Sequence, residues 1–199
     1  MKNRKSGDAG IKYDPAQVRI HEAYTVAIRD LGVHGEGIGS VDGFTVFVHG
    51  ALSGETVTAE ITLLKKSYAL GKLLSIEQES PFRMVPECPV YENCGGCQLS
   101  HLTYEGQLEM KYRRVKDVID RIAGESGDLV RPVLPAAHPF AYRNKMAVPA
   151  GLVKGKAALG CYRQGSHDII PVSSCAIQKE ENNRLLQFAR RFIEKYRIS

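Results

Sequence analysis

The five cysteines constrain this chain more than any other feature, and they are Cys88, Cys94, Cys97, Cys161 and Cys175. The first three lie within ten residues, in the string C-P-V-Y-E-N-C-G-G-C. Gly95 and Gly96 allow a sharp backbone turn between the second and third of these thiols. A fourth thiolate from a distant segment then completes a tetrahedral sulfur shell around a metal. We therefore expect the chain to fold around a metal centre.

Disulfides and zinc are the alternatives to an iron–sulfur cluster. A secreted disulfide scaffold needs a signal peptide, but residues 1–10 have no apolar core, and an odd number of cysteines cannot all pair. Zinc stays open, because four thiolates suit zinc as well as iron and C-G-G-C resembles a zinc-ribbon knuckle. A zinc ribbon usually carries a second C-x-x-C, which this sequence lacks. The C-x5-C-x2-C run with one remote cysteine therefore favours an iron–sulfur cluster.

Length and composition predict a globular protein with two domains, one of them small. The chain has 199 residues, of which 43% are hydrophobic, so it can bury a core. No apolar run approaches the length that spans a membrane. We expect a soluble, cytoplasmic protein with no membrane partner, and nothing in the sequence indicates a protein partner.

Basic residues are concentrated in the second half of the chain. The formal net charge is +5, and the stretch from Arg131 to Arg163 contains no Asp or Glu. Within it, Arg143 and Lys145 are candidates for phosphate contacts and Tyr142 for stacking on a base. The alternative is a solvated sheet face with its aromatic rings turned inward. The lack of acidic residues favours RNA.

The first part of the chain is expected to form a small β-barrel. Residues 1–20 are polar and predict a flexible tail. Residues 21–80 predict an OB-like barrel of short strands separated by glycine-rich turns. The predicted strands are Ala23–Arg29, Ser40–Val41, Phe44–His49, Glu55–Leu64 and Tyr68–Ile76. Between the last two strands, Lys65 and Lys66 form a basic hairpin that is a second candidate RNA contact.

The string G-V-H-G-E-G-I-G, residues 32–39, does not predict a phosphate loop. It lacks the G-K-[ST] ending, and no helix pattern follows it, so the helix terminus that holds a phosphate is missing. A turn with close backbone approach explains these glycines better.

Residues 81–199 predict the cysteine segment and part of a central domain, which makes the fold class mainly β with helices (α+β). One helix is expected after the cysteines, with Thr103 as its N-cap and Gly124 at its end. Its apolar stripe consists of Leu108, Tyr112, Val115, Ile119 and Ile122. Residues 131–177 predict a strand-rich region with turns at Pro149–Gly151 and Gly165–Ser166. A last helix, Lys179–Tyr196, is expected to present a stripe of Leu185, Ala189, Phe192 and Tyr196.

Several strings resemble the bacterial uracil-5 RNA methyltransferases, and they are H-G-E-G-I-G, the run Phe44 to Glu55, C-P-V-Y-E-N-C-G-G-C-Q-L-S-H-L-T-Y, F-A-Y-R-N-K and V-S-S-C-A-I-Q. The cysteine segment is the most specific of them. The sequence is most similar to the 23S ribosomal RNA branch, which joins an N-terminal TRAM domain to a four-cysteine segment, whereas the tRNA branch usually lacks both. The resemblance runs from about His21 onward and covers about the first half of such an enzyme.

This resemblance implies a ligand set and a partner. Cys88, Cys94, Cys97 and Cys175 would match the four ligands of a [4Fe-4S] cluster, and the TRAM and central regions would bind RNA, here 23S ribosomal RNA. Cys161 is left over, and we interpret it as a small buried hydrophobe in a strand. We favour a structural role for the cluster over a redox role.

The same resemblance places the chemistry outside this sequence. In the family, a cysteine thiolate adds to C6 of a flipped uracil, C5 accepts a methyl group from S-adenosylmethionine, and a carboxylate removes the C5 proton. The Rossmann-like domain that binds S-adenosylmethionine and carries this cysteine would follow residue 199. We therefore expect no catalytic residue here and no activity from this chain alone. Two other functions stay open: a standalone RNA-binding module with a structural metal, and an iron–sulfur electron carrier.

Overall fold

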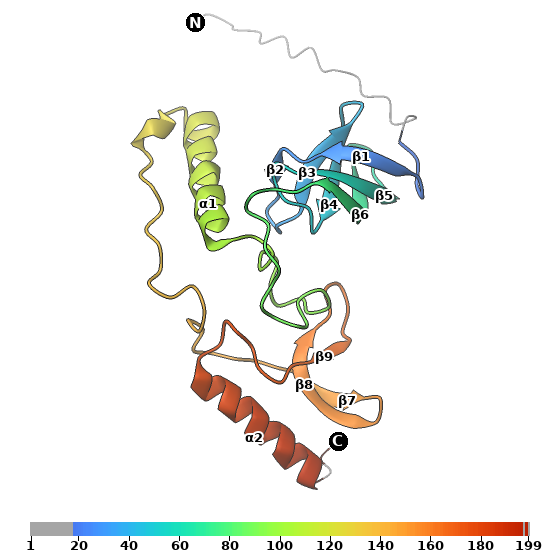
Figure 1. Cartoon of the computed structure of the whole chain (residues 1–199), viewed down its shortest axis with the longest axis vertical. Helices are drawn as coiled ribbons and strands as arrows, with labels where there is room; N and C mark the ends of the chain where they lie inside the picture. Colours follow the sequence, from blue (N-terminus) through green and yellow to red (C-terminus); the bar gives the residue numbers. More distant parts are fainter. Residues whose placement is uncertain (1–17, 197, 199) are drawn as a thin grey trace, which may run out of the picture. The chain divides into compact units, whose positions relative to one another are not determined.

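The structure, a computed structural model, describes residues 18–196 and 198, which divide into two compact units at Pro81/Phe82 (Figure 1). Most of the predicted tail, residues 1–20, lies outside the described residues. Its last three residues are described, and Val18 is 2% exposed and belongs to the core of the first unit. The ordered part of that unit therefore begins before His21.

The first unit is a six-stranded sheet in the order β1-β5-β6-β4-β3-β2 (Figure 1). Its strands are β1 Ala23–Ala27, β2 Asp30–Leu31, β3 Gly37–Val41, β4 Phe44–His49, β5 Thr56–Leu64 and β6 Tyr68–Gln78. All neighbours pair antiparallel except β4 and β6, which are parallel. The five predicted strands are confirmed to within a few residues at their ends, and the two-residue strand β2 is the addition.

The sheet curls so that its β1 edge meets β3. The backbone N–H of Arg29, just after β1, donates to the carbonyl of Ile38 in β3 over 2.8 Å. Alternation of side chains along β5 then sends Val57, Ala59 and Ile61 inward, and all three are fully buried. Their alternation with threonine and glutamate confirms that one face of this strand is buried and the other faces solvent.

The glycines of residues 32–39 serve close packing and a turn. A Cβ on Gly37 would lie 2.9 Å from the carbonyl oxygen of Ala51, and one on Gly39 would overlap Val26 and the carbonyl of Ala27. Gly35 has a φ of +84°, which favours glycine at the turn before β3. The predicted close backbone approach is confirmed at these positions.

A buried carboxylate organises the turn before β5. Glu55 is 1% exposed, and its Oε2 accepts a hydrogen bond from the Leu52 N–H over 2.7 Å. Its Oε1 accepts from the Ser80 N–H over 3.3 Å. Because each buried N–H needs an acceptor, this one side chain ties the start of β5 to the segment after β6.

The second unit contains two helices and a three-stranded sheet. Its elements are α1 Tyr104–Val118, η2 Ile119–Ala123, η3 Gly127–Leu129, β7 Ala150–Val153, β8 Lys156–Tyr162, β9 Ile169–Pro171 and α2 Glu180–Tyr196. The sheet order is β7-β8-β9, with antiparallel pairs. No helix among the described residues is both long and apolar enough to cross a membrane.

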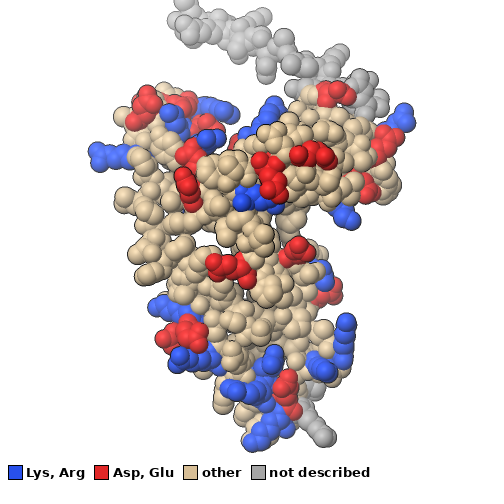
Figure 2. Space-filling view, viewed as in Figure 1, with Lys and Arg blue, Asp and Glu red and all other residues tan. Residues whose placement is uncertain are grey.

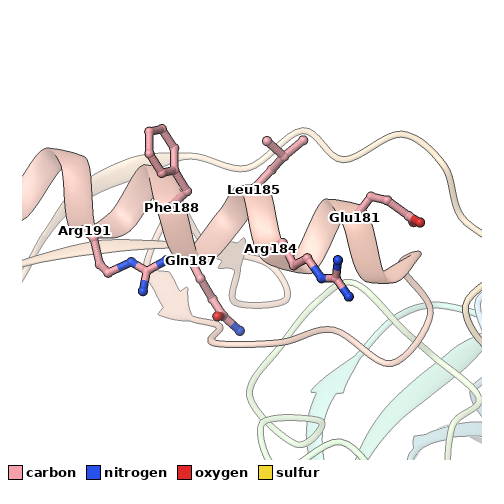
Figure 3. Close-up of a pocket in the computed structure, with 6 residues that line it drawn as sticks. All are labelled: Glu181, Arg184, Leu185, Gln187, Phe188 and Arg191. Atoms are coloured by element: carbon pink, nitrogen blue, oxygen red, sulfur yellow. The ribbon is translucent and has the colours of Figure 1, made fainter.

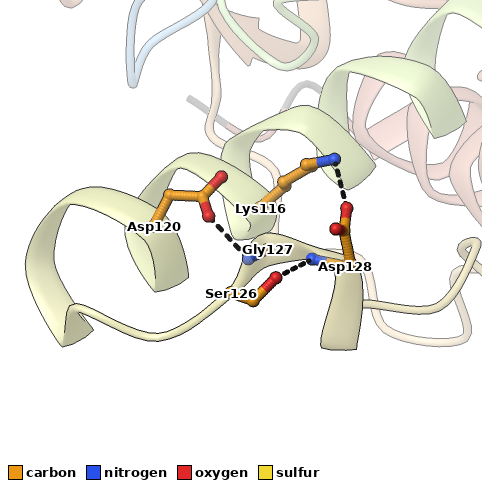
Figure 4. Close-up of polar contacts among 5 residues, drawn as sticks. All are labelled: Lys116, Asp120, Ser126, Gly127 and Asp128. Atoms are coloured by element: carbon orange, nitrogen blue, oxygen red, sulfur yellow. Dashed lines mark hydrogen bonds and ion pairs between the residues drawn. The ribbon is translucent and has the colours of Figure 1, made fainter.

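The predicted first helix is confirmed from its cap to its end. The Thr103 hydroxyl accepts from the Gly106 N–H over 3.2 Å, and Gly124 ends the helix with a φ of +71°. The last turn widens into the π-helix η2. Beyond it the chain folds back, and the Asp120 carboxylate accepts from the Gly127 N–H over 2.5 Å (Figure 4). The Lys116 ammonium and the Asp128 carboxylate form an ion pair at 3.2 Å.

The predicted apolar stripe of this helix is only partly buried. Val115 is 49% exposed and Ile122 is 79% exposed. Spacing along the sequence placed them on one face but did not show whether a second element covers that face.

Residues 131–149, all of them described, form no strand, so the expected strand-rich region begins only at Ala150. This stretch contains four prolines, which have no N–H to donate to a strand ladder. They are Pro132, Pro135, Pro139 and Pro149. The turn expected at Pro149–Gly151 is wrong, because Ala150 and Gly151 belong to β7. The hairpin turns instead at Lys154 and Gly155, which have positive φ angles. The turn at Gly165–Ser166 is confirmed.

The second predicted helix is confirmed, but its buried face is different. Leu186 is 5% exposed and packs with Leu159 and Val172, joined by Ala189 and Ile193. The predicted stripe is wrong for Leu185, Phe192 and Tyr196, which are 63%, 45% and 58% exposed. Figure 3 shows Leu185 and Phe188 on one side of the helix and Arg184, Gln187 and Arg191 on another, around a shallow hollow. The helix therefore has two apolar faces, one buried and one exposed. The spacing of apolar residues in the sequence predicted the exposed face.

Candidate metal centre and nucleic-acid-binding residues

The first three cysteines lie in a loop made of consecutive turns. The Cys88 carbonyl accepts from the Tyr91 N–H over 3.2 Å, and the Val90 carbonyl accepts from the N–H groups of Asn93 and Cys94 over 3.1 and 2.9 Å. These short-range bonds wind residues 88–97 into a compact loop. All of this loop belongs to the second unit.

The C-G-G-C turn packs against the end of β8. Cys94 forms an isolated antiparallel bridge with Arg163, and the Gly95 N–H donates to the Tyr162 carbonyl over 2.9 Å. A Cβ on Gly95 would lie 2.9 Å from that oxygen and 3.0 Å from the Gln164 nitrogen. Glycine is required there because the two backbones touch.

The surroundings of Cys97 include the thiol of Cys175, which comes from a distant segment. Burial raises the pKa of Cys97, and the charges of Cys175, Cys94 and Cys88 raise it further, whereas a hydrogen bond from Ser100 lowers it. All four cysteines implied by the resemblance belong to the second unit.

Cys161 also belongs to this group of thiols. It lies in β8, as expected of a strand residue, but it is only partly buried. Burial and its neighbours Cys94, Cys175 and Cys97 raise its pKa to about 11. The interpretation of Cys161 as a small buried hydrophobe in a strand is confirmed for the strand, whereas the side chain is only partly buried.

Cys175 is held by the second helix. The Asn183 side chain accepts from the Cys175 N–H over 2.9 Å and donates to its carbonyl over 3.2 Å. Asn183 is 6% exposed, so these bonds satisfy polar groups away from solvent. The sequence analysis missed this residue, although an asparagine in the buried face of a helix is a signal worth reading.

The cysteines offer sulfur ligands, but the described residues do not form a metal-holding group. All five cysteines are described and are free thiols. In the described residues, no three or more His, Cys, Asp or Glu side chains converge closely enough to hold a metal ion. Sulfur-only coordination suits zinc or an iron–sulfur cluster and does not suit calcium or magnesium.

Tyr91 braces the cysteine loop from within. Its hydroxyl donates to the Gln98 carbonyl over 2.9 Å and also shares a short hydrogen bond with the His101 ring. Burial raises the pKa of Tyr91 to about 12. His101 and Gln98, which the sequence places near the thiols, thus both contact this tyrosine.

The candidate RNA-binding residues lie at the surface of both units. Lys65 and Lys66 are exposed between β5 and β6. In the second unit, Arg143 and Lys145 are exposed, and Tyr142 is 61% exposed, so the alternative of a core position for this ring is wrong. In Figure 2, the part of the second unit that carries α2 and the β7–β9 sheet shows more Lys and Arg than Asp and Glu.

Tyr142 and Arg143 share a hollow with the cysteine loop. This hollow, about 380 Å³ in volume, is lined by Cys97, Gln98, Phe140, Tyr142 and Arg143, among others. The Arg143 backbone is fixed there, since its N–H donates to the Ile177 carbonyl and its carbonyl accepts from the Lys179 N–H. The segment after Cys175 therefore positions both the last thiol and these surface residues.

Arg163 differs from the other basic residues of the acid-free stretch. Its guanidinium donates to Asn93 Oδ1 over 2.7 Å and lies 3.9 Å from the Asp168 carboxylate. It holds the cysteine loop to the end of β8, a role that the sequence did not reveal.

Comparisons with known proteins identify the first unit and relate the whole chain to a class of enzymes. Residues 16–74 match the TRAM domain. A Bacillus cereus protein named as an RNA methyltransferase is 48% identical over 92% of this chain, and one from Clostridium tetani is 42% identical over 92%. The chain is therefore a relative of the proteins named RNA methyltransferases. It spans about two fifths of their length, 40% and 39% respectively.

A solved structure shares the fold. The tRNA (uracil-54, C5)-methyltransferase of Pyrococcus abyssi, in complex with S-adenosyl-L-homocysteine, matches 88% of this chain and 38% of its own, with a TM-score of 0.63. At 24% identity this likeness concerns the fold alone. Mixed sheets with few helices, as expected from the sequence, are confirmed.

Proposed function

We propose that this chain is the RNA-binding and iron–sulfur portion of an S-adenosylmethionine-dependent methyltransferase that acts on C5 of uridine in 23S ribosomal RNA. The observation that carries the proposal is the match of residues 16–74 to the TRAM domain in a chain that also contains Cys88, Cys94, Cys97 and Cys175. The relatives named RNA methyltransferases support the reaction class.

Cys88, Cys94, Cys97 and Cys175 would hold a [4Fe-4S] cluster. When bound, the cluster supplies a cross-link between the 88–97 loop and the segment that leads into α2, which stabilises the folded state. Two side chains near the thiols hold the backbone in place. Tyr91 hydrogen-bonds to the Gln98 carbonyl within the loop, and Asn183 hydrogen-bonds to the Cys175 backbone.

The RNA would be bound by both units. Lys65 and Lys66 would contact phosphates from the first unit, and Arg143 and Lys145 from the second. Tyr142 offers an exposed ring on which an unpaired base can stack. Because the chain spans two fifths of its relatives, methyl transfer is proposed for the protein as a whole.

RNA binding is tested by gel-shift titration against structured 23S fragments at two salt concentrations. Affinity should fall steeply with salt, and Arg143→Ala with Lys145→Ala should weaken binding and flatten the salt slope by about one unit for each phosphate interaction removed. Arg121→Ala is the matched control, since its guanidinium pairs with Asp117 at 3.7 Å. If the protein does not bind the RNA fragments at low salt, the proposed RNA-binding function is wrong.

The metal is tested by anaerobic purification with iron, sulfide and zinc analysis. A brown protein with about four iron and four sulfide ions per chain is expected. Cys94→Ser should lose iron and solubility together. A colourless protein with one zinc ion per chain would favour the alternative of an RNA-binding module with a structural zinc.

The reaction is tested in cells by mass spectrometry of 23S ribosomal RNA with and without the gene. Loss of one 5-methyluridine in the deletion strain is expected. Unchanged methylation with retained RNA binding would indicate a standalone RNA-binding module. Reversible reduction of the cluster without RNA affinity would indicate an electron carrier.

A further inference from the structure

The segment of residues 140–143 presents two aromatic rings and a cation to one hollow of the second unit. Phe140, Tyr142 and Arg143 all line the hollow of about 380 Å³ described above. The two rings stay open to solvent, with Phe140 40% and Tyr142 61% exposed. Between them, Ala141 has a φ of +52°, a left-handed conformation that residues other than glycine rarely adopt. Such strained conformations persist only where the surrounding structure fixes them, and they are concentrated at ligand sites.

Backbone hydrogen bonds fix this segment in place. The Ala141 N–H donates to the Ala176 carbonyl over 2.9 Å. Two residues further on, the Arg143 N–H donates to the Ile177 carbonyl, also over 2.9 Å. An aromatic side chain has only two side-chain torsions, so a ring on a fixed backbone loses little conformational entropy when a ligand covers it. The Tyr142 ring is therefore prepared for stacking before any ligand arrives.

The wall of the hollow formed by the first helix carries one amide on an apolar surface. Leu102, which is 4% exposed, and the Gln107 side chain of α1 both line the hollow. Gln107 Nε2 donates to the carbonyls of Leu99 and Leu102 over 3.2 and 2.9 Å. These two bonds use both amide hydrogens, so Gln107 offers only its Oε1 acceptor to a ligand. The two carbonyls also fix which end of the amide is nitrogen, because an amide oxygen cannot donate to them.

The charge and size of the hollow indicate what it accepts. Among the described residues that line it there is no Asp or Glu, and Arg143 supplies a positive charge. Its volume lies within the range of about 300–1,000 Å³ that is typical of small-molecule sites. A matching ligand has a flat apolar face, a hydrogen-bond donor at its edge and a negative charge beside it. A nucleotide with an unpaired base has all three.

We propose that this hollow binds a single unpaired base of the RNA, which stacks on the Tyr142 ring while its amino group donates to Gln107 Oε1 and its phosphate contacts Arg143. The inference rests on the proposed RNA-binding function and deepens it from contact with RNA to the capture of one base. It requires no metal at the cysteines. Stacking tolerates every base, whereas the amide acceptor favours adenine, guanine or cytosine over a similar base without an amino group.

The test uses 2-aminopurine, a base that carries an amino group and whose fluorescence is quenched when it stacks on an aromatic ring. A set of 23S fragments is prepared, each with one 2-aminopurine at a different unpaired position, and titrated with the full chain. Wild-type protein should quench the fluorescence at one position. Tyr142→Ala should abolish that quenching and bind about tenfold more weakly, whereas Tyr142→Phe should retain both properties. Tyr196→Ala is the matched control, because this ring of α2 is 58% exposed and lies outside the hollow.

The amide contact has a separate measurement. Purine lacks the amino group, so an RNA with purine at the quenched position should compete for the wild-type protein about fivefold more weakly than the 2-aminopurine RNA. Equal competition by the two RNAs would overturn the contact with Gln107.

Failure of this inference differs from failure of the proposed function. If wild-type protein binds the RNA but quenches at no unpaired position, or if Tyr142→Ala behaves as the wild type does, the hollow does not bind a base and RNA binding stands. If wild-type protein does not bind the RNA at low salt, the proposed RNA-binding function is wrong and the inference falls with it. Quenching that depends on Tyr142 in a protein without metal would support the inference, since the hollow acts without the proposed metal site.

Discussion

The Arg163 guanidinium donates a hydrogen bond to Asn93 Oδ1 over 2.7 Å, joining two residues that are 70 positions apart in the sequence. The contact fixes the cysteine loop to the strand that carries Cys161. It also removes one cation from the acid-free stretch that the sequence assigned to RNA. Among the basic residues there, position in the fold decides which ones support structure.

Replacing Arg163 by alanine should destabilise the second unit. A charge-assisted hydrogen bond contributes about 1.5–3 kcal/mol when buried and less at this half-exposed site, so a loss of about 1 kcal/mol is expected. A double-mutant cycle with Asn93→Ala, measured by urea unfolding, should give most of that value as coupling energy. Additive effects of the two substitutions would show that the pair does not act together.

Asn183→Ala should release Cys175 from its place. The substitution removes the partners of a backbone N–H and a carbonyl, and each buried polar group left unbonded costs about 1–3 kcal/mol. Denaturant unfolding should show this loss, and iron content should fall with it. Gln187→Ala is the control on the same helix, because its contact with the Ser173 carbonyl is exposed and long, at 3.5 Å. Equal stability of both variants would show that the Asn183 side chain does not stabilise the Cys175 backbone.

Glu55→Ala should lower the free energy of unfolding of the first unit more than the substitution of any exposed residue in that unit. The Leu52 and Ser80 N–H groups would lose their acceptor, and a cavity would remain where the side chain was buried. We expect a loss of about 2–4 kcal/mol, measured by circular dichroism during urea unfolding of the chain. The partly exposed Glu60→Ala is the comparison and should cost under about 1 kcal/mol. Comparable losses would contradict the role assigned to Glu55.

The two glycines of the C-G-G-C turn should respond differently to alanine. Gly95→Ala places a methyl group against the Tyr162 carbonyl and the Gln164 backbone, neither of which can move without shifting β8. Gly96→Ala makes only ordinary contacts, at 3.4 and 3.6 Å from two sulfurs. Metal content and thermal stability should therefore fall clearly for Gly95→Ala and little for Gly96→Ala. The opposite order would mean that the loop does not rest on β8 as described.

The first unit could be predicted well because its information is local. Alternation of Val57, Ala59 and Ile61 with polar residues encodes a half-buried strand directly, and glycines mark the turns. The strand β2 was missed because two residues give no period. The first helix was predicted from Thr103 to Gly124 for the same reason, since caps and spacing are local signals.

The second unit could be predicted only in part because its contacts are long-range. The cysteine string predicted a metal-binding segment, but Arg163, which holds that segment, lies 70 positions from its partner Asn93. The partial exposure of Cys161 was missed because burial depends on which segments cover β8, and that is not encoded in its sequence neighbours. The buried face of α2 was misassigned because Leu185 and Leu186 both continue an apolar spacing, and only packing against β8 decides between them.

Asn183 holds Cys175 from eight residues further along, so the last sulfur is fixed only after the start of α2 exists. A ribosome adds about 5–20 residues per second, so roughly 4–17 seconds separate synthesis of Cys97 from synthesis of Asn183. During that interval the newly made chain contains the 88–97 loop without the helix that fixes Cys175. Any function that needs Cys175 in its final place must therefore wait until α2 has been synthesised.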